Sequence, residues 1–203
     1  MAGRPRGVED EVILRAAAEV MGRVGPSGLT LAVVAREVGL VPGTLVQRFG
    51  SKRGLILALA DQSVRDTDAL PDRVRAEHGS ALGALAALLA EWTAPMVSPQ
   101  TFANHLAFLC MDLTDPELHE RALAVHEAQR RAVGTLLTQA LSTGELRATT
   151  DVEALTATVQ AVTSGAGLVW ALDRQGTIVQ RVRRGLDAVL APHIAAHTAT
   201  ATA

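Results

Sequence analysis

Hydrophobic residues recur at intervals of three or four along most of this chain, which is the period of amphipathic α-helices. The first stripe lies within residues 10–24 and consists of Ile13, Ala17, Val20 and Val24. The Gly25-Pro26 pair that follows is typical of a helix end, because glycine leaves the helical conformation easily and proline cannot continue the backbone hydrogen bonds. A second, shorter helix is predicted by the stripe Leu31, Val34, Ala35 and Val38.

A tight turn and a third helix follow directly. Gly39 can leave the second helix with a positive φ at little cost. Pro42 suits the first turn of the next helix, where its missing N–H would have had no partner. Leu45 and Phe49, four residues apart, form the inward face of that helix, and Gly50 ends it. Two short helices joined by a tight turn and packed on a third are typical of a helix-turn-helix.

The residues left on the outer face of the third helix can contact DNA. Thr44 can donate to a phosphate or touch a thymine methyl, and Gln47 can pair with adenine through two hydrogen bonds. Arg48 can meet guanine or phosphate, and Gly43 also points outward. Nothing in this set suits catalysis. A plain solvated face is the alternative for any single short helix, but the three-helix setting favours DNA binding.

Ser51 can cap a fourth helix, which places Lys52 in its first turn. A cation there opposes the helix dipole, so its presence requires another reason. Free backbone N–H groups and an ammonium group both attract an anion, and we therefore expect Lys52 to hold a DNA phosphate. Lys52 is the only lysine in the chain, and the other basic residues are arginines. Either a functional role or chance can account for this one lysine.

Charge is divided unevenly along the chain, although its net value is only −2. Residues 1–54 contain eight Lys/Arg against five Asp/Glu, whereas residues 55–203 contain eleven against sixteen. The basic part coincides with the predicted DNA reader, as phosphate neutralisation requires. Arg4 and Arg6 can add contacts as a flexible arm, or they can belong to a merely solvated tail.

The rest of the chain shows helical periodicity throughout, without β-type alternation or repeats, so the fold class is predicted to be all-α. Pro71 is expected to end the fourth helix near residue 69, with a loop over 72–79. Thr150 and Glu153 have capping-box spacing and predict the start of another helix. The further helices are expected over about 82–95, 102–109, 115–141, 150–168 and 177–190, with a frayed tail over 197–203.

The larger side chains of this alanine-rich part can line a mostly apolar pocket with a few polar groups. One face of a predicted helix carries Phe102, His105, Leu106 and Leu109. Each candidate can instead belong to the core, and for His105 a satisfied buried histidine is the commoner case. The predicted ligand-binding set is Trp92, Met96, Phe102, His105, Leu109, His126 and Trp170.

Other chemistries find little support. His193 and His197 have a metal-ligand spacing but no third ligand close in sequence, and no metal or cofactor is predicted. Cys110 lies in an apolar run without a neighbouring cation, which favours inert packing. A single cysteine excludes an internal disulfide and suits a reducing compartment. Charged residues are expected to interrupt the long hydrophobic runs, so neither a signal peptide nor a membrane span is expected, and the cytoplasm is the predicted location.

The first quarter of the chain resembles the TetR family of bacterial repressors over roughly residues 9–56. The residues that carry the resemblance are Thr30, Ala35, Gly39, Gly43, Thr44, Leu45, Phe49, Lys52 and Leu55. The chain departs from the family at Val41, Val46 and Arg48, where serine, tyrosine and histidine are usual. The loss of the tyrosine removes a phosphate contact, which Arg48 can replace with a charge-assisted one. Val41 offers no hydroxyl cap.

The resemblance implies a DNA-binding domain over residues 1–54 and an effector-binding and dimerisation domain over residues 55–203. It also implies a homodimer held by the last two long helices and an inducer pocket. The predicted DNA contacts are Thr30, Pro42, Gly43, Thr44, Gln47, Arg48 and Lys52. The leading hypothesis is a repressor that a small hydrophobic molecule releases from an inverted-repeat operator. The alternatives are a regulator controlled by a protein partner and a helical binding protein or enzyme without DNA binding.

Overall fold

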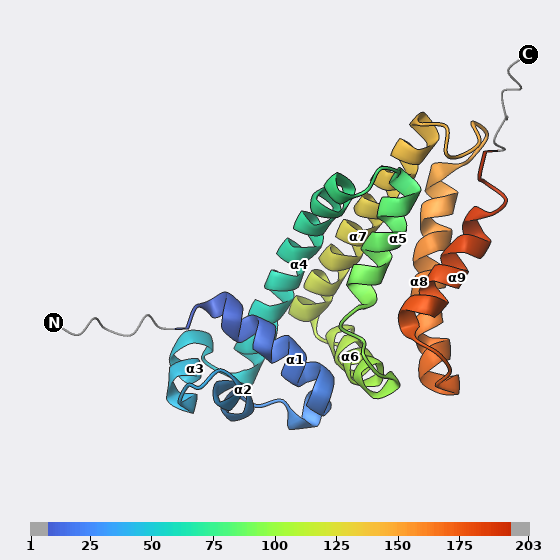
Figure 1. Cartoon of the computed structure of the whole chain (residues 1–203). Helices are drawn as coiled ribbons and strands as arrows, with labels where there is room; N and C mark the ends of the chain where they lie inside the picture. The colour runs from blue at the N-terminus through green and yellow to red at the C-terminus, as the bar shows by residue number, and fades with distance from the viewer. Residues whose placement is uncertain (1–7, 196–203) are drawn as a thin grey trace, which may run out of the picture. The chain divides into compact units, whose positions relative to one another are not determined.

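A computed structural model describes residues 8–195 of the chain, and this described part is helical, which confirms the predicted fold class (Figure 1). Its single β-type contact is a bridge between Leu146 and Ile194. The helices are α1 Asp10–Gly28, α2 Leu31–Glu37, α3 Pro42–Phe49, α4 Lys52–Glu77, α5 Ala81–Thr93, α6 Pro99–Asp112, α7 Pro116–Ser142, α8 Val152–Asp173 and α9 Ile178–Leu190. They form two compact units, the first made of residues 8–66 and 98–125 and the second of residues 67–97 and 126–195.

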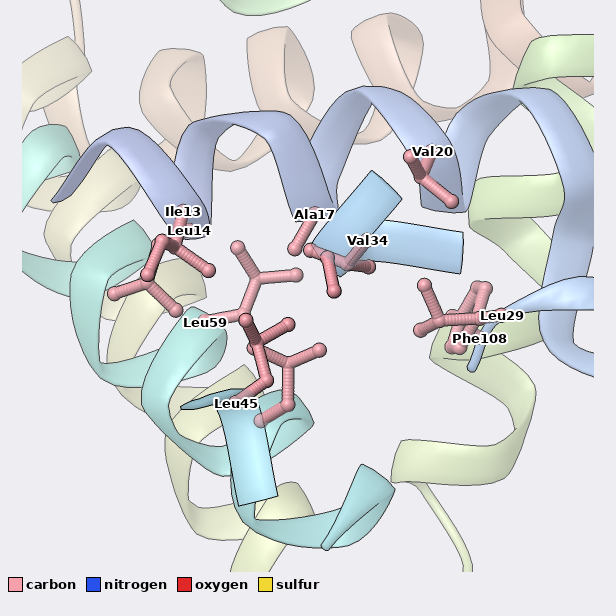
Figure 2. Close-up of a cluster of buried hydrophobic side chains, with 11 residues drawn as sticks. Ile13, Leu14, Ala17, Val20, Leu29, Val34, Leu45, Leu59 and Phe108 are labelled. Atoms are coloured by element: carbon pink, nitrogen blue, oxygen red, sulfur yellow. The ribbon is translucent and has the colours of Figure 1, made fainter. Parts of the chain in front are cut away.

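The first unit is built around one apolar cluster that five helices and the α1–α2 connection share. Figure 2 shows side chains from these segments pointing into a common centre. The cluster contains the predicted stripes of α1 and α2 and consists of Ile13, Leu14, Ala17, Val20, Leu29, Val34, Ala35, Leu45, Leu55, Leu59 and Phe108. Leu45 is completely buried and Phe49 packs against the cluster, as their spacing in α3 predicts. The inner face of α3 is therefore fixed by this core.

The turns of the first unit also agree with their residue types. Gly39 and Gly50 have φ values of 68° and 73°, which side chains with a Cβ rarely adopt. Thr30 caps α2 by accepting from the Val33 N–H at 3.2 Å. Pro42 is the first residue of α3, and Val41 before it provides no side-chain cap. Proline and the surrounding packing therefore define the start of this helix.

The Gly25-Pro26 pair interrupts α1 without ending it. Gly25 has φ 68° and ψ −176°, outside the helical range, and one more turn follows to Gly28. Asn104 of α6 lies against this break and donates to the Gly22 carbonyl at 2.8 Å. The predicted stop is therefore a kink, and α6 satisfies a carbonyl next to it.

Helix α4 continues past Pro71 to Glu77, so the predicted end at residue 69 and the loop over 72–79 are wrong. Val74 is buried in the second unit, and Arg75 donates to the Gln139 side chain at 2.9 Å and to the His78 carbonyl at 2.7 Å. These contacts with α7 and with the end of α4 offset the hydrogen bond that proline cannot make.

In the second unit, α9 packs against both α5 and α8 (Figure 1). Glu145 caps α5 by accepting from the N–H groups of Ala81 at 2.8 Å and Leu82 at 3.2 Å. Burial acts to raise the pKa of Glu145, but these N–H groups favour the charged form more strongly, so its pKa is lowered. A carboxylate distant in sequence therefore anchors the start of α5.

Three residue-level expectations for this part of the chain are wrong. Asp151, not Thr150, caps α8, and it accepts from the Ala154 N–H at 3.0 Å, while the Thr150 hydroxyl is buried without a hydrogen-bond partner among residues 8–195. On α6 the buried residue is Phe108, one position before the exposed Leu109. Cys110 is exposed rather than packed. The cap of α8 is thus one residue later than predicted, and the buried position of α6 is one residue earlier.

Helix α8 is long and apolar enough to cross a membrane by length and composition, with 28% of its most apolar window buried. It carries no charged residue between Glu153 and Asp173, so the expectation that charges interrupt every hydrophobic run is wrong here. Leu168 lies on its exposed side. The outer surface of α8 is therefore apolar.

The connection from α8 to α9 is held by side chains at both ends. Trp170 is buried and its indole N–H donates to the Gly176 carbonyl at 3.1 Å. Arg181 pairs with Asp173 at 2.6 Å, and Arg174 adopts the left-handed conformation at φ 57°. The pKa of Asp173 is lowered by the Gln175 N–H and by the Arg181 guanidinium. These contacts fix the geometry of the last helix pair.

The close passage of α3 and α4 predicts that Gly54→Ala destabilises the protein. A Cβ on Gly54 would lie 2.0 Å from the Phe49 carbonyl oxygen, so the backbone must move. We expect the free energy of unfolding to fall by about 2 kcal/mol in denaturant titrations at fixed protein concentration. The matched control is Gly43→Ala, where nothing lies within 4 Å of the added atom. Equal stability of the two variants would contradict the packing described here.

A second pair of variants tests the α8–α9 connection. Trp170→Phe removes a bonded indole N–H and is expected to cost about 2 kcal/mol of unfolding free energy. Trp92→Phe removes a buried indole N–H that has no partner in the described residues, so a smaller loss or none is expected. Thermal unfolding followed by circular dichroism compares the two, and a larger loss for Trp92→Phe would overturn this assignment.

Candidate nucleic-acid interface

The outer face of α3 is open to solvent. Gly43 and Gln47 are exposed, Thr44 is half-buried beside them, and a Cβ on Gly43 would meet nothing within 4 Å. This is the face that the helical spacing predicts. Because Leu45 holds the opposite side in the core, these groups can approach another molecule without any rearrangement of the helix.

Two exposed valines extend this surface. Val41 before the helix is 68% exposed, and Val46 within it is 50% exposed. The sequence pattern assigns them no contact, since it marks them only as departures from the usual family residues. The signal that identifies them is their exposure, because an aliphatic side chain on the outer face of a reader helix adds apolar contact area there.

Arg48 is exposed but its guanidinium is already engaged. Its Nη1 donates to the Asp10 carboxylate at 2.9 Å and to the Val8 carbonyl. These bonds join the end of α3 to the start of α1. A contact from Arg48 to DNA must use its other N–H groups or exchange these partners.

Lys52 is half-buried and donates to the Pro26 carbonyl. This bond explains a cation in the first turn of α4, since the ammonium group satisfies a carbonyl in the last turn of α1. Ser51 caps the same helix, accepting from the Gly54 N–H at 3.1 Å, as predicted. The ammonium group retains two further donors with which it can meet an anion.

A charged cluster joins the start of α4 to the turn before α7, within the first unit. Arg53 pairs with Asp115 at 2.9 Å and with Glu117 at 2.6 Å. Burial acts to raise the pKa of Asp115, but the Leu118 N–H and Arg53 outweigh it, so its pKa is lowered. Burial and the nearby Asp115 charge raise the pKa of Asp112. Arg53 is thus occupied within the chain, like Arg48 and Lys52.

The seven predicted ligand-binding residues are divided between the two units. Phe102, His105 and Leu109 lie in the first unit, and Trp92, Met96, His126 and Trp170 lie in the second. His105 is half-buried against Gly22 of α1, and burial lowers its pKa. Leu109 and His126 are exposed. Their role in binding an effector stays a prediction.

The two tryptophans differ in a way that bears on that prediction. The Trp170 indole N–H is used inside the chain, whereas the Trp92 indole N–H is buried without a partner among the described residues. A buried donor without an acceptor is costly unless something supplies one. Trp92 is therefore the candidate with an unmet hydrogen-bonding group.

Two open cavities lie within the second unit. One, of about 410 Å³, lies between α5 and α9 and has lining residues that include His78, Leu89, Val182 and Arg183. The other, of about 650 Å³, lies between α7 and α8 and is lined by residues such as Arg130, Arg131 and Glu153. None of the seven predicted ligand-binding residues lines either cavity.

Several predictions fall on residues that the structure does not describe. Arg4 and Arg6, the proposed arm, and the tail 197–203 lie outside residues 8–195. His193 is described but His197 is not, so the pair cannot be assessed as a metal site. Over residues 8–195, no group of three or more His, Cys, Asp or Glu side chains is placed to hold a metal ion.

Two family models match this chain. The model described as "Bacterial regulatory proteins, tetR family" matches residues 13–59, which contain α2 and α3 and most of α1. The model described as "Tetracyclin repressor-like, C-terminal domain" matches residues 81–186, more than half of the chain.

A curated relative is the HTH-type transcriptional regulator BetI of Stenotrophomonas maltophilia (strain R551-3). It is 32% identical over 77 residues, which make up 36% of this chain and 39% of that protein. The match therefore covers about two fifths of the relative's length.

Solved structures share the fold over nearly the whole chain. A Rhodococcus sp. protein assigned to the TetR family matches with a TM-score of 0.66 and 22% identity over 90% of this chain and 96% of its own. SmeT, the repressor of the Stenotrophomonas maltophilia multidrug efflux pump SmeDEF, gives 0.66 and 16%, over 94% and 93%. FadR from Bacillus subtilis, solved with stearoyl-CoA, gives 0.64 and 16%, over 89% and 97%. With both family models matched, this chain belongs to the TetR family of bacterial transcriptional regulators.

Proposed function

We propose that this protein is a dimeric repressor that binds an inverted-repeat operator and is released by a small hydrophobic molecule. The observation that carries the proposal is the outer face of α3, where Gly43, Thr44 and Gln47 remain accessible while Leu45 is fixed in the core. An exposed reader helix on a compact helical unit is suited to enter a major groove. The protein acts as a regulator in the cytoplasm, not as an enzyme.

The proposed contacts divide into those that read bases and those that position the protein. Gln47 pairs with adenine, and Thr44 touches phosphate or a thymine methyl. Arg48 and Lys52 contact phosphates through the donors that their bonds inside the chain leave available. The hydroxyl of Thr30 and the backbone beside Pro42 and Gly43 complete the surface. Residues 1–54 form the proposed DNA-binding domain, and residues 55–203 bind the effector and the second subunit.

The proposed effector is a mostly apolar molecule that carries a hydrogen-bond acceptor. Trp92 supports this class because its buried indole N–H lacks a partner in the described part of the chain. FadR from Bacillus subtilis, which shares the fold, was solved with stearoyl-CoA, a molecule that has a long apolar chain. An effector bound by residues of the larger domain releases DNA if it favours a spacing of the two readers that does not fit the operator.

The proposed dimer interface lies on α8 and α9. The exposed surface of α8 carries Leu168, Val169 and Leu172, and Leu172 is 77% exposed. Alanine and glycine at positions 154, 157, 161 and 165 lie on the same side and allow close approach of a second helix. A four-helix bundle with the same pair from a second copy would cover this surface, which accounts for the apolar composition of α8 without a membrane.

The base-reading role of Gln47 predicts a loss of specificity when it is shortened. Operator fragments selected from the source genome are titrated with the protein by fluorescence anisotropy at several salt concentrations. Gln47→Ala and Thr44→Ala should each weaken operator binding about tenfold, with little change on unrelated DNA. Lys52→Ala should weaken binding to all sequences and reduce the slope of affinity against salt by about one unit. Unchanged binding by the triple variant would refute the assigned contacts.

The interface on α8 predicts that one buried charge dissociates the dimer. Leu172→Asp should give a monomer at micromolar concentration in sedimentation velocity, because an unpaired carboxylate would lie in an apolar interface. The control is Val97→Asp, an 81% exposed position outside α8 and α9, which should remain dimeric. If the wild-type protein sediments as a monomer of 21.3 kDa, the proposed interface is wrong.

A further inference from the structure

We propose that α3 reads adenine–thymine pairs, with thymine methyl groups against Val46 and Val41 and adenine on Gln47. This proposal rests on the proposed function, since it specifies what the reader helix recognises. Two observations support it. The first is which side chains on and beside α3 are accessible, and the second is that Arg48, the one basic residue of α3, already makes hydrogen bonds inside the chain.

The exposed valines are the first observation. Val46 is 50% exposed although Leu45 beside it is completely buried, so Val46 is not needed to fill the core. Val41 is 68% exposed at the start of the same helix. At position 46 valine is a weaker helix former than Arg, Lys, Gln or Glu, and at the N-cap position 41 it lacks the oxygen that serine or threonine would offer. These two side chains therefore offer apolar surface on the proposed DNA-binding side at a cost to local stability.

Thymine provides the matching chemistry. In the major groove it presents a C5 methyl group, the apolar feature that distinguishes it from the other three bases. A valine side chain placed against that methyl removes apolar area from water on both partners. The amide of Gln47 adds two hydrogen bonds that fit the N6 and N7 positions of adenine. The accessible valines and Gln47 therefore match thymine and adenine, the two bases of an A·T pair.

Guanine is disfavoured because the one basic residue of α3 is engaged. A specific contact to guanine uses two parallel N–H groups of an arginine on O6 and N7. In Arg48, Nη1 donates both to Asp10 and to the Val8 carbonyl. These two bonds use both N–H groups of Nη1, so the fork formed by Nη1 and Nη2 is lost, and only the edge formed by Nε and Nη2 retains two parallel donors, in the direction that the bonds to Asp10 and Val8 fix. The structure therefore reduces the capacity of α3 to select G·C pairs.

The test begins with the full-length protein and a pool of random duplexes. Binding selection should enrich A·T pairs at the positions that α3 protects in each half-site. Each thymine of the selected site is then replaced by uracil, which retains base pairing and lacks the methyl group. We expect the dissociation constant to rise about fourfold at the one or two thymines that the valines contact, and to stay unchanged at thymines outside the protected positions.

Variants then assign the methyl contacts to residues. In Val46→Ala, and separately in Val41→Ala, replacing one particular thymine by uracil should no longer raise the dissociation constant, because the valine that contacted its methyl group is gone. Val12→Ala is the matched control, because Val12 is a 47% exposed valine on α1, and it should keep the full rise in the dissociation constant. Alanine is a good helix former, and circular dichroism verifies that each variant is folded.

The outcomes separate the two proposals. Failure to bind any DNA would contradict the proposed function itself. Specific binding with G·C pairs at the protected positions, or with no sensitivity to uracil, would overturn A·T reading and leave the proposed function standing. If replacing thymine by uracil still raises the dissociation constant in both Val46→Ala and Val41→Ala, the assignment of the methyl contacts to these valines is also overturned.

Discussion

Burial of one face of α3 against the apolar cluster of the first unit is the constraint on which the candidate site depends. Leu45 and Phe49 anchor the helix from one side, and Gly54 lets the start of α4 pass close to its end. Because a helix has only one opposite side, this packing decides which residues face solvent. The accessible set is then a consequence of the core and not an independent property of the loop.

The basic residues near the reader helix have a structural role in addition to their proposed role in DNA binding. Arg48 joins α3 to the start of α1, Lys52 satisfies the Pro26 carbonyl, and Arg53 pairs with Asp115 and Glu117. Their charge still contributes to the field that attracts DNA. Their directional hydrogen bonds, however, are partly used inside the chain, which favours the proposed discrimination between bases by the uncharged groups of α3.

The sequence predicted the local features of the first unit because each depends on a residue type with a strong backbone preference. Gly39, Pro42 and Gly50 mark the turn and both ends of α3, and the spacing of Leu45 and Phe49 gives its inner face. The predictions failed where contacts distant in sequence override local signals. Pro71 does not end α4, since Val74 and Arg75 hold the following turn against the second unit.

The ion-pair partners of the charged side chains could not be predicted from the sequence pattern either. Asp10 lies 38 residues before Arg48, and no periodicity links them. The cap of α8 was misplaced by one residue because Thr150 and Asp151 are both good capping residues, and only packing decides between them. The predicted ligand set, chosen for side-chain size, falls in both compact units, so size alone did not locate a pocket.

The account is tested most directly by mapping where DNA touches the protein in solution. Backbone amide chemical shifts of the isotope-labelled protein are recorded with and without a selected operator duplex. The largest changes should fall on residues 41–48, with the amides of the buried α1 stripe less affected. If those residues are unchanged while another surface responds, α3 is not the reader and the central claim is wrong.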